Sequence, residues 1–243
     1  MKVLQIILLS LTTLSGCAKN KNTLPPAKTD TPSTAKTMTN ASDTLNYLAI
    51  GDSYTIGEAV PESQTFPYQL YSALNGQALS VTPPTIIATT GWTTDDLISA
   101  IYQSGLGGKK FAIVTLLIGV NDQYQHLSQD NYKIKFAEVL NTAITFAHGD
   151  TSRVFVLSIP DYGVTPFANG QDAVIGPEID QFNAINKAIS IKAGVHYIDI
   201  TPISREAAND PSLIAPDGLH PSAKMYQLWV NLLMPLVEAR LKR

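Results

Sequence analysis

The chain has 243 residues, of which 44% are hydrophobic and 15% are charged, and this composition fits a folded globular domain rather than an unfolded chain. Its formal net charge of −3 gives no reason to expect nucleic acid or an anionic surface as a partner. A single cysteine excludes an internal disulfide, and because the four histidines stand apart in the sequence we expect no metal site.

The N-terminus has the pattern of a bacterial export signal. Lys2 provides a positive charge, and Val3–Leu14 is an apolar run too short to span a bilayer, for which a helix needs about 20 residues. The run ends in Leu-Ser-Gly-Cys, which resembles a lipobox, so we expect residues 1–16 to be a lipoprotein signal peptide and Cys17 to carry the lipid. Because Ala18 follows, where an aspartate would favour retention in the inner membrane, we expect the outer membrane if the host has one. An ordinary secretion signal that contains a cysteine is the alternative.

The next segment differs from both the signal and the rest of the chain. Residues 17–44 are rich in Thr, Lys, Asn, Ala and Pro and contain few side chains that could enter a core. Such a composition cannot bury enough apolar area to offset chain entropy, so we expect a disordered tether. The folded domain is expected over residues 45–243.

Strand-like and helix-like patterns alternate through this domain. Short apolar runs predict strands over Leu45–Ile50, Pro84–Ala88, Phe111–Ile118, Val154–Ile159 and Val195–Ile200. Apolar residues three and four apart predict helices over Phe66–Leu74, Asp95–Tyr102, Tyr132–Ala147 and Ile179–Ile191, with a last helix that starts at Pro221. The alternation predicts an α/β fold with a parallel sheet covered on both faces, in one domain without internal repeats.

Four short segments carry candidate chemistry, and each follows a predicted strand or precedes a predicted helix. This edge of an open α/β sheet, beyond the carboxyl ends of the strands, is where ligands bind. After the first predicted strand, the sequence Gly51-Asp52-Ser53-Tyr54 puts Ser53 at a turn near backbone N–H groups, where it could act as a nucleophile. Asp-Ser also makes ordinary turns and caps, and Thr55 stands where a Gly-x-Ser-x-Gly elbow would have its second glycine.

The second segment precedes the last predicted helix, where Asp217 stands three residues before His220. That spacing lets the carboxylate hold the Nδ1–H of the imidazole while Nε2 faces outward as a general base. A loop aspartate that caps Gly218, beside a surface histidine, is the alternative interpretation.

The other two segments follow strands. Asn121 comes after the most apolar run, where its NH2 group could donate to a developing oxyanion, although Gly and Asn also favour strand-ending turns. Gly91 follows the second predicted strand, and a glycine permits close approach of its backbone N–H to a ligand. By itself Gly91 is equally well explained as a turn residue.

Together the four segments resemble the signature blocks of the GDSL (SGNH) hydrolase family, in the same order and over essentially all of residues 45–243. The family's Ser-Gly-Asn-His quartet corresponds to Ser53, Gly91, Asn121 and His220, with Asp217 as the third member of the triad. Tyr54 stands where the family's name has leucine, a common variation that leaves the chemistry intact.

The resemblance implies a flavodoxin-like, three-layer α/β/α sandwich with five parallel strands that hydrolyses esters or thioesters without metal or cofactor. It also implies that His220 takes the proton of Ser53, which attacks the acyl carbonyl. The oxyanion would be held by the N–H groups of Ser53 and Gly91 and by the side chain of Asn121.

Further side chains are expected near the substrate, namely Tyr54, Trp92, Val120, Tyr162 and Phe167. Trp92 could wall an acyl pocket or simply pack in the core. The segment 161–177 is long for a connection between a strand and a helix, and because such loops are usually functional or disordered we expect it to border the site. His196 and Trp229 are expected to be structural.

These observations lead us to expect an exported, lipid-anchored, monomeric serine esterase that acts on short-chain or carbohydrate O-acyl esters. Lysophospholipids and thioesters are the alternative substrates. A lipoprotein that binds glycans or peptides on an inactive hydrolase scaffold is the alternative of another class. The intact serine, asparagine, aspartate and histidine argue against it.

Overall fold

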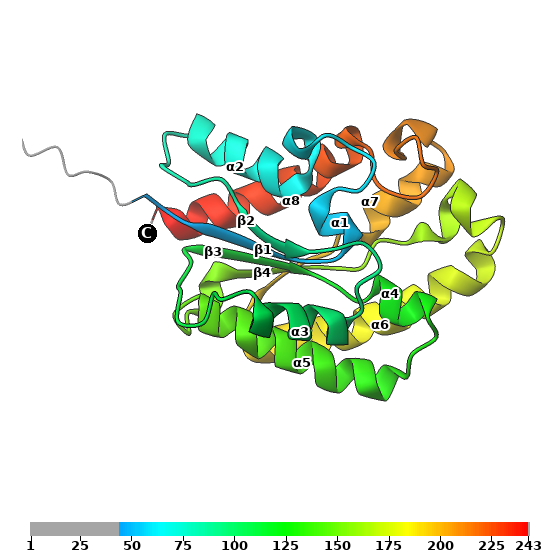
Figure 1. The fold of residues 1–243 in the computed structure, drawn as a ribbon. Helices are drawn as coiled ribbons and strands as arrows, with labels where there is room; N and C mark the ends of the chain where they lie inside the picture. The colour runs from blue at the N-terminus through cyan, green and yellow to red at the C-terminus, as the bar shows by residue number, and fades with distance from the viewer. Residues whose placement is uncertain (1–43, 243) are drawn as a thin grey trace, which may run out of the picture. The chain divides into compact units, whose positions relative to one another are not determined.

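Five parallel strands form one sheet in the computed structural model, which describes residues 44–242 (Figure 1). The strands are β1 (Tyr47–Gly51), β2 (Thr85–Ala88), β3 (Ile113–Leu117), β4 (Val154–Leu157) and β5 (His196–Ile198), in the spatial order β2-β1-β3-β4-β5. Each overlaps an apolar run that predicted a strand, and the expected parallel sheet is confirmed. The expected signal peptide, Cys17 and nearly all of the expected tether lie outside the described residues.

Helices cover both faces of this sheet (Figure 1). One face carries α2 (Phe66–Gly76) and α8 (Ala223–Leu241), and the other carries α3 (Thr94–Gln103), α5 (Gln129–Phe146) and α6 (Asp172–Ala193). This arrangement confirms the three-layer α/β/α sandwich. Within residues 44–242, no helix is both long enough and apolar enough to cross a membrane.

Shorter helical segments connect these elements. Three are α-helical, namely α1 (Ser53–Ile56), α4 (Val120–Tyr124) and α7 (Thr201–Arg205). Single 3-10 turns are η1 (Glu62–Gln64), η2 (Thr151–Arg153), η3 (Tyr162–Val164), η4 (Pro166–Ala168), η5 (Glu206–Ala208) and η6 (Pro211–Leu213).

The core lies on both faces of the central strands. Every residue of β1, β3 and β4 is buried, as expected for parallel strands that are covered on both sides, and this explains why their sequences are nearly continuous apolar runs. Trp229 of α8 is fully buried against the rings of Phe66 and Tyr226, so its expected core position is confirmed.

The register of the sheet brings three loops to one edge. Gly51 at the end of β1 pairs with Ala88 at the end of β2 and with Leu117 at the end of β3. These three strands therefore end level with one another, and the segments that follow them, which contain Ser53, Gly91 and Asn121, leave the sheet side by side.

Three predicted helix starts were wrong by two residues or more. The helix predicted from Tyr132 starts three residues earlier, at Gln129. The last helix starts after Pro221, at Ala223, because the side chain of Ser222 accepts the N–H of Met225 and so caps it, while Pro221 forms a short β-bridge with Ile214.

The helix predicted over Ile179–Ile191 starts earlier, at Asp172, and contains Pro177. Tertiary contacts hold its first turns, since Ile175 and Gly176 are buried there. The expected loop over 161–177 is correspondingly shorter.

Candidate active site

Ser53 lies in the turn that leads from β1 into α1. Asp52 caps this helix, because its side chain accepts the N–H of Tyr54 at 3.0 Å. A side chain at Gly51 would stand 2.2 Å from the carbonyl oxygen of Leu117, so only glycine lets β1 run this close to β3. Ser53 is thereby held at the first residue of a helix, 5% exposed and beside N–H groups that have no partner within the helix.

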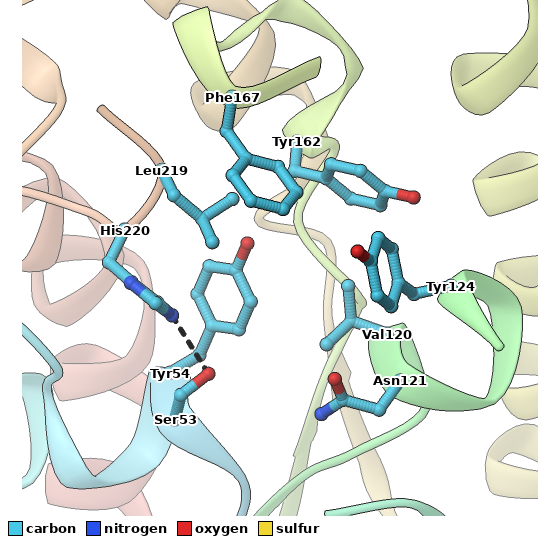
Figure 2. A pocket seen from close by; sticks show the side chains of 9 residues that line it. All are labelled: Ser53, Tyr54, Val120, Asn121, Tyr124, Tyr162, Phe167, Leu219 and His220. Atoms are coloured by element: carbon cyan, nitrogen blue, oxygen red, sulfur yellow. Dashed lines mark hydrogen bonds between the residues drawn. The ribbon is translucent and has the colours of Figure 1, made fainter. Parts of the chain in front are cut away.

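Two hydrogen bonds join Ser53, His220 and Asp217. Nε2 of His220 lies 2.9 Å from Oγ of Ser53 (Figure 2), and Nδ1 lies 2.6 Å from Oδ2 of Asp217. The other carboxylate oxygen of Asp217 accepts the backbone N–H groups of Leu219 and His220, each at 3.0 Å. The structure thus brings together the serine, the histidine and the aspartate singled out in the sequence.

The surroundings of Asp217 keep its carboxyl group ionised. Partial burial opposes the charge, but hydrogen bonds from the His220 ring and from two backbone N–H groups outweigh it and hold the pKa of Asp217 below its ordinary value. Because an ionised carboxylate only accepts hydrogen bonds, Nδ1 of His220 must donate, and Nε2 is left to accept from Ser53. This arrangement can withdraw a proton from the Ser53 hydroxyl.

Asn121 lies in the first turn of α4, directly after β3. Its Nδ2 donates to the carbonyl oxygen of Trp92 at 2.9 Å, which fixes the orientation of the amide. Gly119 allows the chain to turn here, because its φ is +124° and a Cβ would stand 2.6 Å from the hydroxyl of Tyr132. The amide NH2 group has a second hydrogen and belongs to a side chain of the same cavity as Ser53 (Figure 2).

Gly91 lies in the exposed loop between β2 and α3. Its φ is +81°, a conformation that other residues adopt only with strain. A Cβ there would meet nothing within 4 Å among the described residues, so the glycine is required by the backbone conformation rather than by crowding.

Two buried carboxyl groups are the sequence neighbours of Ser53 and Asn121, and neither was assigned a role from the sequence. Asp52 is completely buried, and burial raises its pKa to about 8, opposed in part by the N–H of Tyr54 and helped by the charge of Asp122. Asp122 is 2% exposed and accepts the N–H of Thr94 at 2.9 Å. Burial raises the pKa of Asp122 as well, against the effect of this hydrogen bond.

A cavity of about 100 Å³ opens beside Ser53 and His220. It is lined by Ser53, Tyr54, Val120, Asn121, Tyr124, Tyr162, Phe167, Leu219 and His220 (Figure 2). Tyr124, Tyr162 and Phe167 form an aromatic group in its wall, with ring centroids between 6.0 and 6.3 Å apart. Among the described residues, no carboxylate, lysine or arginine lines this cavity, so it suits a neutral, largely apolar group.

Four of the five expected pocket residues line this cavity, and Trp92 does not. Trp92 instead lines a separate depression together with residues of β2 and α3 and packs against the core, while its carbonyl oxygen accepts a hydrogen bond from Asn121. Tyr124 and Leu219 line the cavity but were not singled out in the sequence. Their positions next to the Asn121 and Asp217–His220 segments were the available signal.

The remaining histidines lie elsewhere. His196 stacks on Phe155 with centroids 4.9 Å apart, which fits a structural role. His126 and His148 are exposed turn residues with positive φ. Within residues 44–242 no three His, Cys, Asp or Glu side chains are grouped as metal ligands.

Comparison with known proteins identifies a family and a shared fold. The model of the "GDSL-like Lipase/Acylhydrolase family" matches residues 49–228. No curated protein sequence matches the chain.

Several solved structures share the fold. TesA matches with a TM-score of 0.64 at 16% identity, over 80% of this chain and 99% of its own. The psychrotrophic esterase EstA from Pseudoalteromonas sp. gives 0.62 at 15% identity, over 82% and 100%. Axe2, an acetylxylan esterase from Geobacillus stearothermophilus, gives 0.61 at 18% identity, over 79% and 94%.

Proposed function

The chain belongs to the GDSL-like lipase/acylhydrolase family and is a carboxylic ester hydrolase, and from this membership we propose that Ser53, His220 and Asp217 are its catalytic triad. The observation that carries the proposal is the pair of hydrogen bonds, 2.9 Å and 2.6 Å long, that joins the three side chains beside the cavity. The alternative interpretation, a surface histidine beside an aspartate that caps a turn, does not explain the hydrogen bond between His220 and the buried Ser53.

In the proposed mechanism Nε2 of His220 takes the hydroxyl proton as Oγ of Ser53 forms a bond to the acyl carbon. Asp217 stabilises the imidazolium that results. When the tetrahedral intermediate collapses, the bond to the alcohol oxygen breaks and His220 gives its proton to the leaving alcohol. Water then attacks the acyl-enzyme with His220 again as the base, which releases the acid and restores Ser53.

We propose that the oxyanion is held by the backbone N–H groups of Ser53 and Gly91 and by Nδ2 of Asn121. Three observations support this. Ser53 starts a helix, where N–H groups have no partner within the helix. Gly91 leaves open space around its backbone. Asn121 has one N–H held by the Trp92 carbonyl, so the second has a fixed direction.

We propose that the natural substrates carry short acyl groups, with O-acyl groups on carbohydrate favoured. The cavity supports this, because its volume of about 100 Å³ is well below the roughly 300–1,000 Å³ of pockets that enclose a drug-sized ligand. The fold is also shared with a protein described as an acetylxylan esterase. Long acyl chains of lysophospholipids, and thioesters, are the second choice.

We further propose that the chain is exported and held in the bacterial cell envelope by a lipid on Cys17, in the outer membrane if the host has one. The support is the apolar run and the Leu-Ser-Gly-Cys sequence at the N-terminus. We also propose that the protein is a monomer.

The proposal is tested by hydrolysis of p-nitrophenyl esters from acetate to palmitate and of acetylated xylo-oligosaccharides. We expect kcat/KM to be highest for the shortest esters, and Ser53→Ala to remove both hydrolysis and covalent labelling by a fluorophosphonate. Labelling that persists in Ser53→Ala would show that another residue is the nucleophile. A maximum at palmitate would contradict the short-acyl proposal and leave the triad untouched.

A further inference from the structure

The loop that carries Gly91 is attached to the rest of the site at few points. Residues 89–93 connect β2 to α3, and a Cβ placed on Gly91 would have no neighbour within 4 Å among the described residues. Nδ2 of Asn121 donates to the carbonyl oxygen of Trp92 at 2.9 Å, and Oγ1 of Thr90 donates to the carboxylate of Glu58. The position of the Gly91 N–H therefore depends on how the ends of this loop are held.

Asp122 holds one of these ends. Its Oδ2 accepts the N–H of Thr94 at 2.9 Å, and Thr94 is the first residue of α3. An N–H in the first turn of a helix has no partner within the helix, and a negative charge at this terminus is favoured by the helix dipole. Asp122, which belongs to α4, supplies both the acceptor oxygen and the negative charge. Burying a carboxyl group is costly unless it is hydrogen-bonded, and this bond compensates for the burial of Asp122.

The same turn of α4 also carries Asn121, so two adjacent residues hold the loop from one side. Asn121 binds the carbonyl oxygen of Trp92 and Asp122 binds the N–H of Thr94, two residues further along. The oxyanion donors come from both elements, namely Gly91 from the loop and Asn121 from α4. A link between the elements fixes the separation of the two donors.

We propose that Asp122 is a positioning residue that sets the distance between the Gly91 N–H and the Asn121 amide by anchoring the start of α3 to α4. The inference rests on the proposed function, because it concerns two of the proposed oxyanion donors. Its consequence is specific: loss of the anchor should weaken binding of the oxyanion and leave binding of the ground-state ester nearly unchanged.

The test compares Asp122→Ala with Asp122→Asn in the full chain. The alanine variant loses the acceptor, and we expect kcat to fall about ten- to a hundredfold with KM little changed, since a misplacement of about 1 Å at a site can cost a hundredfold. The inhibition constant of a trifluoromethyl ketone, which forms an oxyanion on Ser53, should rise by a similar factor. Asp122→Asn keeps an acceptor oxygen for Thr94 and should retain most of kcat.

Tyr47→Phe is the matched control for loss of a buried hydrogen bond. The Tyr47 hydroxyl bonds Oγ1 of Thr115 at 2.9 Å, both residues are fully buried, and Tyr47 lies at the start of β1, the opposite end from the site. We expect Tyr47→Phe to lower Tm without changing kcat. If Asp122→Ala behaves in the same way, or if Asp122→Asn loses as much kcat as Asp122→Ala, the inference is wrong.

Thr94→Pro breaks the same hydrogen bond from the other side, which keeps the test decisive if Asp122→Ala does not fold. Proline suits the first residue of a helix, and Thr93 before it is already extended, with ψ of 175°. We expect a similar loss of kcat, and an unchanged kcat would overturn the inference. Failure of the proposed function looks different, because the unaltered chain would then be inactive or Ser53 unlabelled by fluorophosphonate.

Discussion

At the scale of single residues, the site depends on polar groups that have little freedom. Nδ2 of Asn121 makes a 2.9 Å hydrogen bond to Trp92, so a rotation that would turn the amide away from the cavity also breaks that bond. Donors that are already oriented cost no reorganisation when charge develops on the substrate oxygen. The proposed oxyanion role of Asn121 and its role in the turn are therefore separable by kinetics.

Asn121→Ala should lower kcat by about 10²–10³-fold, the loss typical of one oxyanion donor, with little change in KM because the ground-state carbonyl binds this donor weakly. A fluorophosphonate should still label Ser53, but more slowly. Asn121→Asp keeps the shape of the side chain but replaces the donor by a carboxylate oxygen, which repels the Trp92 carbonyl oxygen and the oxyanion, so it should be impaired at least as much. If Asn121→Ala instead lowers Tm and leaves kcat intact, the asparagine only forms the turn.

Asp52 gives a prediction about stability and pH. Its pKa of about 8 in the folded protein exceeds the value near 3.9 of an unfolded aspartate, so between these values the folded state binds the extra proton. The contribution of Asp52 to the free energy of unfolding should then fall as pH rises from about 4 to about 8.

Asp52→Asn removes this titration and keeps an oxygen to cap the N–H of Tyr54. The Tm of Asp52→Asn minus the Tm of the unaltered chain should therefore increase from pH 5 to pH 8. Melting curves at unit pH intervals test this, and a difference that is constant with pH would contradict it.

At the scale of elements, α4 and the η3–η4 segment build the cavity wall together. Tyr124 of α4 contacts Tyr162 and Phe167, which come from the segment after β4. Phe167 is 48% exposed, so its ring closes the rim rather than filling the core. Replacing Phe167 should therefore change the selectivity for acyl chains more than it changes the stability of the protein.

Phe167→Ala should raise kcat/KM for hexanoate relative to acetate by roughly tenfold, because a methylene accommodated in an apolar pocket changes selectivity by at least that factor. Tm should change little, as is usual for exposed side chains. Tyr102→Ala is the control, since Tyr102 is a 75% exposed aromatic residue at the other end of α3 from Gly91. Equal selectivity in both variants would show that Phe167 does not limit the acyl group.

The same elements show what the sequence could predict. The strands were predictable because a parallel sheet covered on both faces favours nearly continuous apolar runs such as Ile113–Leu117, which only Thr115 interrupts. The short helices α1 and α4, which hold Ser53 and Asn121, were not, because a helix of one turn has no periodicity to detect. The early start of α6 was hidden by Pro177, which tertiary contacts accommodate.

Within the site, spacing alone related Asp217 to His220, since three residues in one turn suffice for contact. Contacts between elements that are distant in the sequence could not be predicted from spacing. The hydrogen bond from Thr94 to Asp122 joins α3 to α4, and the depression that Trp92 lines depends on how α3 lies against β2.

At the scale of the whole molecule, the proposed triad can form only when both ends of the folded domain are in place. Ser53 follows the first strand and His220 precedes the last helix, and 167 positions separate them in the sequence. The hydrogen bond between them forms only when β1 and the loop before α8 are both in place. All the side chains assigned to the site lie between Asp52 and His220, so activity and attachment to a membrane should be separable.

Cys17→Ser should move the protein from the membrane fraction to the soluble fraction, because a lipid on this sulfur is the anchor that the N-terminal sequence predicts. Ester hydrolysis per molecule should not change, because the assigned site residues come later in the chain. Ser53→Ala is the reciprocal control: it should abolish hydrolysis and remain with the membranes. Fractionation of cells that express each variant, followed by a high-salt wash and an assay with p-nitrophenyl acetate, measures both properties at once. If Cys17→Ser still sediments with membranes after the wash, the protein is held by something other than the lipid, and the anchor must be sought elsewhere in the chain.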